Sequence, residues 1–458
     1  MYRVLSFDER LGQLFMIRAH SDKGTDHVAA VEQMILKYHV GGLCFFQGTP
    51  EEQVKLINRY QKLSARIPMM IGIDGEWGLG MRMKNTTISF PRQLTLGAIQ
   101  DNKLIYEMGK EIAYEMRRVG VHINFAPVAD INNNASNPVI NTRSFGEDRY
   151  NVAAKSYMYM KGMEDHGVMA CAKHFPGHGD TDVDSHLELP IIKHSRSRLD
   201  SIELYPFKVL AEQGISSFMV AHLSVPAFDK RENRPTSLSY PTITELLRQE
   251  FAYDGLIFTD ALEMKGVTKY FANGLTEAEA LQAGNDILLL PENIEAAIRE
   301  IKNYLQNGKI SEVQLEASVK RVLRAKYRFG LTTFQPIKEK NILQDINAPR
   351  ALAVKQSLYE HALTLVRNRN EVLPFRDLET LKVASISLGT ERETPFQQRL
   401  NTYAAMLHLQ TDKNVTEADV RQLMQKLNDK EVVIVSLHDL SSYESRGYGI
   451  NGKRNSIS

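Results

Sequence analysis

Short apolar runs alternate with longer helical segments through roughly the first 330 residues of the chain. Each run is apolar throughout rather than at every second residue, which is typical of strands buried on both faces in a parallel, helix-covered sheet. About eight such strand–helix units predict a (β/α)8 barrel of the TIM type rather than an open sheet. The expected strands are residues 14–19 (which could equally complete an N-terminal helix), 40–46, 68–74, 122–128, 168–173, 216–222, 255–260 and 286–290.

Polar side chains follow these apolar runs at the point where each run ends. In a barrel the carboxyl ends of all strands meet on one rim, where active sites lie. An open doubly wound sheet would instead spread the same residues along a crevice. The residues concerned are Asp74, Asp130, Lys173, His174, His222 and Asp260.

The chain after the expected barrel changes character. Residues 332–350 are polar without clear periodicity and are predicted to be a linker between a barrel at 1–331 and a second domain at 351–458. That domain begins as an α/β unit, with helices expected at 351–361, 395–407 and 416–427 and strands at 363–366, 382–388 and 431–437. The printed sequence stops at NGKRNSIS, and the strands expected before that point are too few for a stable sheet. We therefore expect a partial, truncated C-terminal α/β domain; the alternatives are that this half is disordered or that a partner completes it.

Composition excludes several classes of partner. The net charge is +1 and the charges are interspersed, without the basic stripe that a nucleic-acid surface needs. No apolar run approaches the ~18–20 residues of a membrane-spanning helix. Cys44 and Cys171 lie in apolar runs and are expected to be buried thiols rather than a disulfide framework. The N-terminus lacks a secretory layout; a periplasmic or cell-envelope location is favoured over the cytoplasm if the natural chain begins upstream of Met1.

The run KHFPGHGDTDVDSH, residues 173–186, holds three histidines and three aspartates. Asp184 and His186 are two residues apart, so in an extended segment their side chains point the same way. The carboxylate can hold one ring nitrogen and leave the other for a substrate, which is the arrangement of general acid–base catalysis. A histidine titrates near ~6.5 and can give and take a proton near neutral pH. The alternative is that His186 is an ordinary loop histidine and Asp184 merely a neighbouring carboxylate.

A metal site is a second interpretation of the same run. An EF-hand-like start fails because Ser185 stands where the turn glycine belongs and Ile191 where the bidentate glutamate belongs. A barrel metallohydrolase stays open as an alternative, although the Lys173 ammonium would lie where a divalent cation has to bind. We expect no metal and no cofactor. The possible ligands are His174, His178, Asp180, Asp182, Asp184 and His186.

Other strand-end residues could also serve a site. Asp260 ends a strand in LIFTDALEM, where an unpaired charge costs several kcal/mol; the alternative is a helix N-cap. Asp74 lies in the glycine-rich GIDGEWG, where the alternative is an Asp-Gly turn. Arg82 and Arg143 are forked donors that suit hydroxyls or carboxylates, unless they form ordinary ion pairs. His222 could be either a site residue or a satisfied core histidine.

KHFPGHGDTDVDSH, with IGIDGEWG before it and GLIFTDALEM after it, closely resembles the β-N-acetylhexosaminidase branch of glycoside hydrolase family 3. The resemblance covers about residues 5–331 as the barrel, and the later part resembles the start of the family's C-terminal α/β sandwich domain. It implies that Asp260 is the catalytic nucleophile and His186 the acid/base, with Asp184 as its dyad partner. It implies retaining hydrolysis through a glycosyl-enzyme intermediate.

The resemblance also implies a sugar pocket and a substrate class. DGEWGLGMR departs from the DQEGGRVQR of short cytoplasmic members, so Gly75 and Trp77 are expected to change the pocket lining near Asp74. The expected partner is a small carbohydrate, an N-acetylglucosaminide such as a peptidoglycan-derived muropeptide. Another sugar preference, phosphorolysis and a non-catalytic carbohydrate-binding role remain alternatives. The residues implied to bind the terminal N-acetylglucosamine are Asp74, Arg82, Arg143, Lys173 and His174, with His222 and Met264 as pocket walls.

Overall fold

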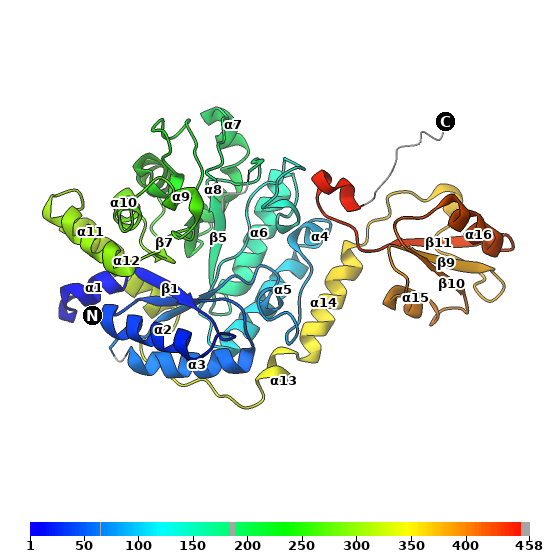
Figure 1. Cartoon of the computed structure of the whole chain (residues 1–458), viewed down its shortest axis with the longest axis horizontal. Coiled ribbons are helices and arrows are strands. Elements are labelled where there is room, and N and C mark those ends of the chain that lie inside the picture. The colour runs from blue at the N-terminus through cyan, green and yellow to red at the C-terminus, as the bar shows by residue number, and fades with distance from the viewer. Residues whose placement is uncertain (65, 184–187, 450–458) are drawn as a thin grey trace. The chain divides into compact units, whose positions relative to one another are not determined.

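A computed structural model describes residues 1–64, 66–183 and 188–449 of the chain (Figure 1). The chain forms two compact units, Met1–Leu363 and Thr364–Ser458. The first unit carries the cavity analysed below.

Eight parallel strands form a ring in the first unit, in the order β7-β6-β5-β4-β3-β2-β1-β8. A bridge between Phe258 and Ile287 joins β7 to the residues before β8 and closes the ring. The prediction of a TIM-type (β/α)8 barrel is therefore confirmed, including the strand at its N-terminus. The strands are β1 (Phe15–Ala19), β2 (Gly42–Phe45), β3 (Met70–Ile73), β4 (Ile123–Asn124), β5 (Met169–Phe175), β6 (Ser217–Val220), β7 (Leu256–Thr259) and β8 (Leu288–Leu289).

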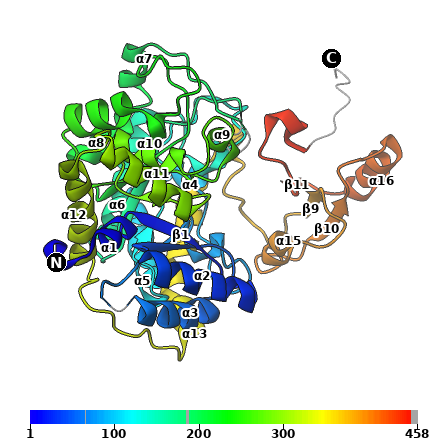
Figure 2. The same ribbon diagram turned by 60° about the vertical axis from the view of Figure 1, so that its left-hand side comes forward.

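Helices surround the strands on the outside of the ring in both views (Figures 1 and 2). The start of α3 illustrates how local sequence sets an element, because Thr49 accepts a hydrogen bond from the Glu52 amide and Pro50 occupies the first turn. The helices of the barrel are α1 (Phe7–Gly12), α2 (Thr25–Tyr38), α3 (Pro50–Leu63), α4 (Gln93–Gly97), α5 (Lys103–Arg118), α6 (Arg149–Glu164), α7 (Arg196–Ser201), α8 (Tyr205–Glu212), the π-helical η5 (Pro241–Glu250), α9 (Lys265–Thr268), α10 (Leu275–Ala283), α11 (Ile294–Gln306) and α12 (Glu312–Arg328).

The segment after α12 stays on the barrel. It contains α13 (Ile342–Ile346) and α14 (Pro349–Ala362), which contact α5. The Asn58 side chain exchanges two hydrogen bonds with the backbone of Ile337, at 2.9 and 2.8 Å, and Arg350 pairs with Glu111 at 2.8 Å. The compact units accordingly divide after Leu363, whereas the sequence places a linker at 332–350 and the second domain from 351. The anchoring contacts are single side chains, which leave no periodic pattern in the sequence.

The second unit contains a three-stranded parallel sheet in the order β10-β9-β11. The strand expected at 363–366 is not formed, and the helix expected at 395–407 ends at Leu400. A strand of sequence LHLQT follows, which was not predicted. Its apolar and polar residues alternate, and it pairs with the central strand. The elements are β9 (Val383–Leu388), α15 (Pro395–Leu400), β10 (Leu407–Thr411), α16 (Glu417–Leu427) and β11 (Val432–Leu437).

Candidate active site

A cavity of about 450 Å³ lies at the carboxyl ends of the barrel strands. Its lining comes from every part of the ring, from β1 to the residue after β8. This is the rim on which the strand-end residues were expected to meet. The lining residues are Arg18, Cys44, Phe46, Asp74, Glu76, Met81, Arg82, Val139, Arg143, Lys173, His174, His178, Met219, Asp260, Ala261, Glu263, Met264, Leu289 and Leu290.

The structure brings together most of the residues singled out in the sequence. Asp184 and His186 lie outside the described residues. His222 is fully buried and lies beside the cavity rather than in its lining. Gly75 and Trp77 are not among the lining residues either, and Glu76 between them is. The predicted residues that line the cavity are Asp74, Arg82, Arg143, Lys173, His174, Asp260 and Met264.

The Lys173 ammonium lies between two carboxylates. Its Nζ is 2.7 Å from Asp74 Oδ1 and 3.0 Å from Glu76 Oε1. Arg82 donates to the other oxygen of Asp74. Burial alone would raise the pKa of Asp74, but Lys173 and Arg82 outweigh it and hold that pKa well below its usual range. Asp74 is thus an ionised acceptor that cations hold in place, suited to accept a hydrogen bond from a sugar hydroxyl.

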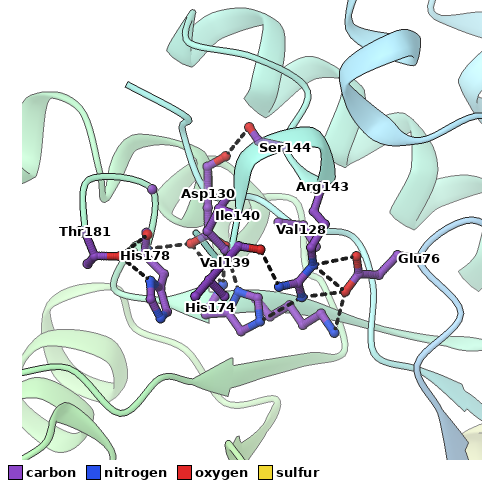
Figure 3. Close-up of polar contacts among 12 residues, drawn as sticks. Glu76, Val128, Asp130, Val139, Ile140, Arg143, Ser144, His174, His178 and Thr181 are labelled. Atoms are coloured by element: carbon purple, nitrogen blue, oxygen red, sulfur yellow. Dashed lines mark hydrogen bonds and ion pairs between the residues drawn. The ribbon is translucent and has the colours of Figure 1, made fainter. Parts of the chain in front are cut away.

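Glu76 and Arg143 form the second part of this network (Figure 3). Glu76 is completely buried and accepts from Arg143 Nε at 2.9 Å and Nη2 at 2.6 Å. Arg143 Nη1 donates to the Val139 carbonyl at 3.1 Å. Burial would raise the pKa of Glu76, but Arg143 and Lys173 lower it to about 2. Most donors of Arg143 are therefore engaged in holding the wall of the cavity.

Asp130 positions two histidines of the β5 segment. Its carboxylate accepts from the backbone amides of His174 at 3.1 Å and His178 at 2.7 Å. The His174 ring meets the same carboxylate through Nδ1 at 2.7 Å, which turns Nε2 toward Arg143 (Figure 3). Burial opposes ionisation of Asp130, yet the His174 ring and the backbone amide of His178 lower its pKa. His178 is buried and neutral, because desolvation lowers its pKa to about 4.

Asn137 joins the loops after β4 and β5. Its Oδ1 accepts from the amides of Val139 and Ile140 at 2.8 Å each, and its Nδ2 donates to the His178 carbonyl at 2.9 Å. The turn that presents Arg143 is thereby fixed to the loop that presents His178.

Asp260 follows β7 and lies on the side of the cavity toward β8. Its Oδ1 accepts from the Ala261 amide at 2.8 Å. Burial would raise the pKa of Asp260, but His222, His174 and that amide lower it. His222 is itself held by the Ala261 carbonyl at 3.0 Å. The result is an ionised carboxylate in the lining of the cavity, which is the state that a nucleophile requires.

Sequence reasoning missed three parts of this site. Glu76 could have been found from the sequence, since GIDGEWG places a second carboxylate two residues after Asp74. Asp130 was noted at a strand end but given no role. Arg18 was hidden inside an apolar run; it lines the cavity and pairs with Glu263.

A group of possible metal ligands lies outside the cavity lining. Among residues 1–64, 66–183 and 188–449, ligand atoms of Asp180, His194 and Glu203 lie within 4.8 Å of one another. His194 and Asp180 already contact each other at 2.7 Å, and Arg198 binds both oxygens of Glu203 at 2.6 and 2.7 Å. A guanidinium thus neutralises Glu203, one of the three possible ligands. Within the cavity, Lys173 takes the place between two carboxylates that a cation would occupy.

Comparison with known proteins identifies the family. The model of the glycosyl hydrolase family 3 N-terminal domain matches residues 6–325. The chain belongs to glycosyl hydrolase family 3. The β-hexosaminidase A of Pseudoalteromonas piscicida is 30% identical over 404 residues, covering 82% of this chain and 67% of that protein. A Cellulomonas fimi protein named β-N-acetylglucosaminidase/β-glucosidase is 26% identical over 375 residues, covering 80% of this chain and 65% of that protein.

A solved family 3 structure extends this comparison to the fold. The β-N-acetylglucosaminidase from Paenibacillus sp. str. FPU-7 is 31% identical with a TM-score of 0.79, covering 95% of this chain and 85% of that one. The chain is thus a glycoside hydrolase of the β-hexosaminidase kind. Within the described ranges, no helix is both long and apolar enough to cross a membrane.

Proposed function

We propose that this family 3 enzyme is a retaining β-N-acetylglucosaminidase in which Asp260 attacks the anomeric carbon of a terminal N-acetylglucosamine. The observation that carries the proposal is the ionised Asp260 in the lining of a cavity that Asp74, Arg82 and Lys173 also line. The charged end suits sugar hydroxyls, which both donate to carboxylates and accept from cations. The relatives named β-hexosaminidase and β-N-acetylglucosaminidase support the choice of sugar.

The proton transfer is assigned to His186, with Asp184 as its orienting partner. Both lie outside the described residues, so the assignment rests on their spacing in the sequence and on the family resemblance. In the first step Asp260 forms a bond to the anomeric carbon while His186 protonates the departing oxygen. In the second step His186 takes a proton from water, which displaces Asp260 with overall retention. Family 3 membership supports a scheme of this kind.

The test of the sugar is a paired assay with 4-nitrophenyl N-acetyl-β-glucosaminide and 4-nitrophenyl β-glucoside. We expect release from the first substrate and much slower release from the second. Faster turnover of the glucoside by the wild-type enzyme would overturn the proposal.

The test of the acid/base uses leaving groups of different basicity. His186→Ala should cost about two to four orders of magnitude in kcat on chitobiose, whose leaving oxygen needs a proton. It should cost much less on an aryl glycoside with an acidic phenol. Equal losses on both substrates would contradict the role of His186.

For the natural substrate we propose fragments of peptidoglycan in which N-acetylglucosamine is linked to N-acetylmuramic acid or its anhydro form. The support is the resemblance to the branch that cleaves such muropeptides. Release of N-acetylglucosamine from purified muropeptides, compared with chitobiose at equal concentration, tests this. Preference for chitobiose would point to chitin fragments instead.

Phosphorolysis is the second candidate reaction. A neutral imidazole acid/base does not repel phosphate as a carboxylate would, so phosphate could replace water in the second step. The assay is turnover with and without phosphate, with analysis for N-acetylglucosamine 1-phosphate. Absence of that product would rule the reaction out.

A further inference from the structure

The helix α12 carries two stripes of apolar side chains, one toward the barrel and one toward solvent. Leu315, Val319 and Val322 are buried and belong to the barrel core. The second stripe lies on the opposite face, where a surface helix is normally polar. Its members follow one another at alternating steps of three and four residues, which is the spacing at which one helix packs along another. The apolar members of this outward stripe are Val313, Ala317, Leu323 and Tyr327.

A groove of about 780 Å³ runs along the outward stripe. Tyr2 of the 3₁₀ helix η1 (Tyr2–Val4) also lines it, and this segment lies beside α12 in both views (Figures 1 and 2). Val313 and Tyr327 are 78% and 75% exposed and lie at the two ends of the stripe. The groove and the active-site cavity are lined by different residues. A contiguous apolar surface of this kind indicates a face that another molecule covers.

Three charged residues alternate with the apolar ones along the stripe. Glu316, Lys320 and Arg324 are spaced four residues apart, and Lys320 Nζ is 2.5 Å from Glu316 Oε1. Lys320, with smaller effects of Arg10 and Arg3, holds the pKa of Glu316 below its usual range, so this carboxyl is ionised. Arg324 forms a long ion pair of 3.4 Å between side chains that are 65% and 64% exposed. Exposed pairs contribute little, so Glu316 and Arg324 can take up a further partner at low cost.

Lys320 lies at the midpoint of the outward stripe. The other members pair off at equal distances on either side of it: 313 with 327, 316 with 324, and 317 with 323. In an antiparallel pair of α12 helices these are the residues that meet, so apolar residues face apolar ones and the acid faces the base. A parallel pair would instead set each charged residue against its own copy. A patch that is complementary to itself when reversed is what a two-fold dimer interface requires.

We propose that this groove binds α12 of a second copy of the chain, with the two helices antiparallel about a two-fold axis at Lys320. Tyr327 of each copy packs on Val313 of the other, and Glu316 of each copy pairs with Arg324 of the other. The two Lys320 ammonium groups meet at the axis, where each keeps the Glu316 of its own chain as counter-ion. From 313 to 327 the stripe covers about four helical turns, so these contacts are spread over about 20 Å.

Charge reversal tests the pairing of Glu316 with Arg324. In sedimentation velocity the wild type should show a mass that rises from monomer toward dimer with concentration. Glu316→Arg and Arg324→Glu each create two like-charge contacts in the dimer, so the dissociation constant should increase about tenfold or more in either variant. An equimolar mixture of the two variants should associate again, because every contact between positions 316 and 324 then joins opposite charges.

Cysteine cross-linking tests the position of the axis. The native Cys44 and Cys171 are buried, so Lys320→Cys supplies an accessible thiol. Mild oxidation should link two copies of this variant, because residues on a two-fold axis approach within the ~4–7 Å between Cα atoms that a disulfide spans. Lys55→Cys on α3 is the matched control, since the side chains of Lys55 and Lys320 are both 53% exposed, and it should stay monomeric.

The remaining controls and outcomes concern the charge variants. Glu52→Arg and Lys55→Glu reverse an exposed ion pair on α3 and should leave association unchanged. All variants should keep the wild-type kcat/KM, which reports that the barrel is folded, since the changed residues lie outside the cavity lining. A monomeric wild type, a dimer insensitive to the α12 variants, or a mixture that stays dissociated would overturn the inference. A monomer that sediments with anionic lipid vesicles would assign the groove to a membrane surface instead.

Discussion

Glu76 and Arg143 are joined by a two-point ion pair, with Arg143 Nε and Nη2 at 2.9 and 2.6 Å from the carboxylate. The Glu76 carboxylate of this pair is buried, and it also forms an ion pair with Lys173. One side chain thus fixes two cations of the cavity wall. Removing one partner of such a network leaves buried charge without compensation, which costs more than the network itself contributes.

Glu76→Gln should destabilise the barrel by about 3–5 kcal/mol, because the change leaves Arg143 and Lys173 without their shared carboxylate. Chemical denaturation measures the free energy of unfolding, and kcat/KM on the aryl N-acetylglucosaminide should fall in parallel. Glu52→Gln is the matched control, since Glu52 forms an exposed pair with Lys55. Equal stability of Glu76→Gln and wild type would show that the network does not hold the wall.

Asp260→Asn should lower kcat on the aryl N-acetylglucosaminide by about 10³-fold or more, because the amide cannot form the glycosyl-enzyme intermediate. Asp254→Asn is the control: Asp254 precedes β7, so it lies at the other end of the same strand, where it pairs with Arg321. Mass spectrometry with a 5-fluoro-N-acetylglucosaminyl fluoride inactivator, which keeps the 2-acetamido group, should label wild type at Asp260. Full activity in Asp260→Asn would refute its assignment.

Asp130→Asn should raise KM more than it lowers kcat, with a loss in kcat/KM of about tenfold. The Asp130 carboxylate accepts from three N–H groups, the amides of His174 and His178 and the His174 ring. An asparagine has one acceptor oxygen, so its NH₂ group would face a donor. The His174 ring is then free to turn. Unchanged KM values for substrate and for N-acetylglucosamine as inhibitor would contradict this role.

Glu277 should make stability fall as the pH rises. Burial raises its pKa from the ordinary 4.5 to about 7, against the opposing effect of nearby backbone amides. Between these values the folded state binds a proton that the unfolded state has lost, so the free energy of unfolding decreases from pH 4.5 to about 7 and then levels off. The decrease is up to about 3 kcal/mol.

Glu277→Gln should remove this decrease, so the variant is more stable than wild type at pH 8 and equal to it at pH 4.5. Unfolding curves at several pH values measure the difference, with the exposed Glu107→Gln as control. A constant difference across the pH range would show that Glu277 does not titrate in this window.

Dialysis against a strong chelator should leave the activity unchanged. Lys173 lies where a cation would bind in the cavity, and Arg198 neutralises Glu203 in the cluster outside it. Atomic absorption on the dialysed enzyme checks metal removal. Loss of activity that Zn²⁺ restores would revive the metallohydrolase alternative.

The barrel and half of the site were predictable because both depend on strand ends. Apolar runs marked the strands, and the polar residue after each run marked the rim, which is how Asp260 and Lys173 were found. Glu76 was missed because it lies in a glycine-rich loop, where no strand or helix periodicity indicates which side chains face the cavity. Arg18 was missed because nothing in an apolar run shows which side chain faces a cavity. The roles of Asp184 and His186 stay predictions, since both lie outside the described residues.

The charges that line the cavity also determine how a substrate arrives. Four carboxylates, Asp74, Glu76, Asp260 and Glu263, balance four cations, Arg18, Arg82, Arg143 and Lys173. Opposite charges within about 3 Å cancel each other at longer range, so this pocket projects little field into solvent. Encounter with a sugar should therefore change little with ionic strength. The cavity selects its ligand by contact after arrival and not by attraction from a distance.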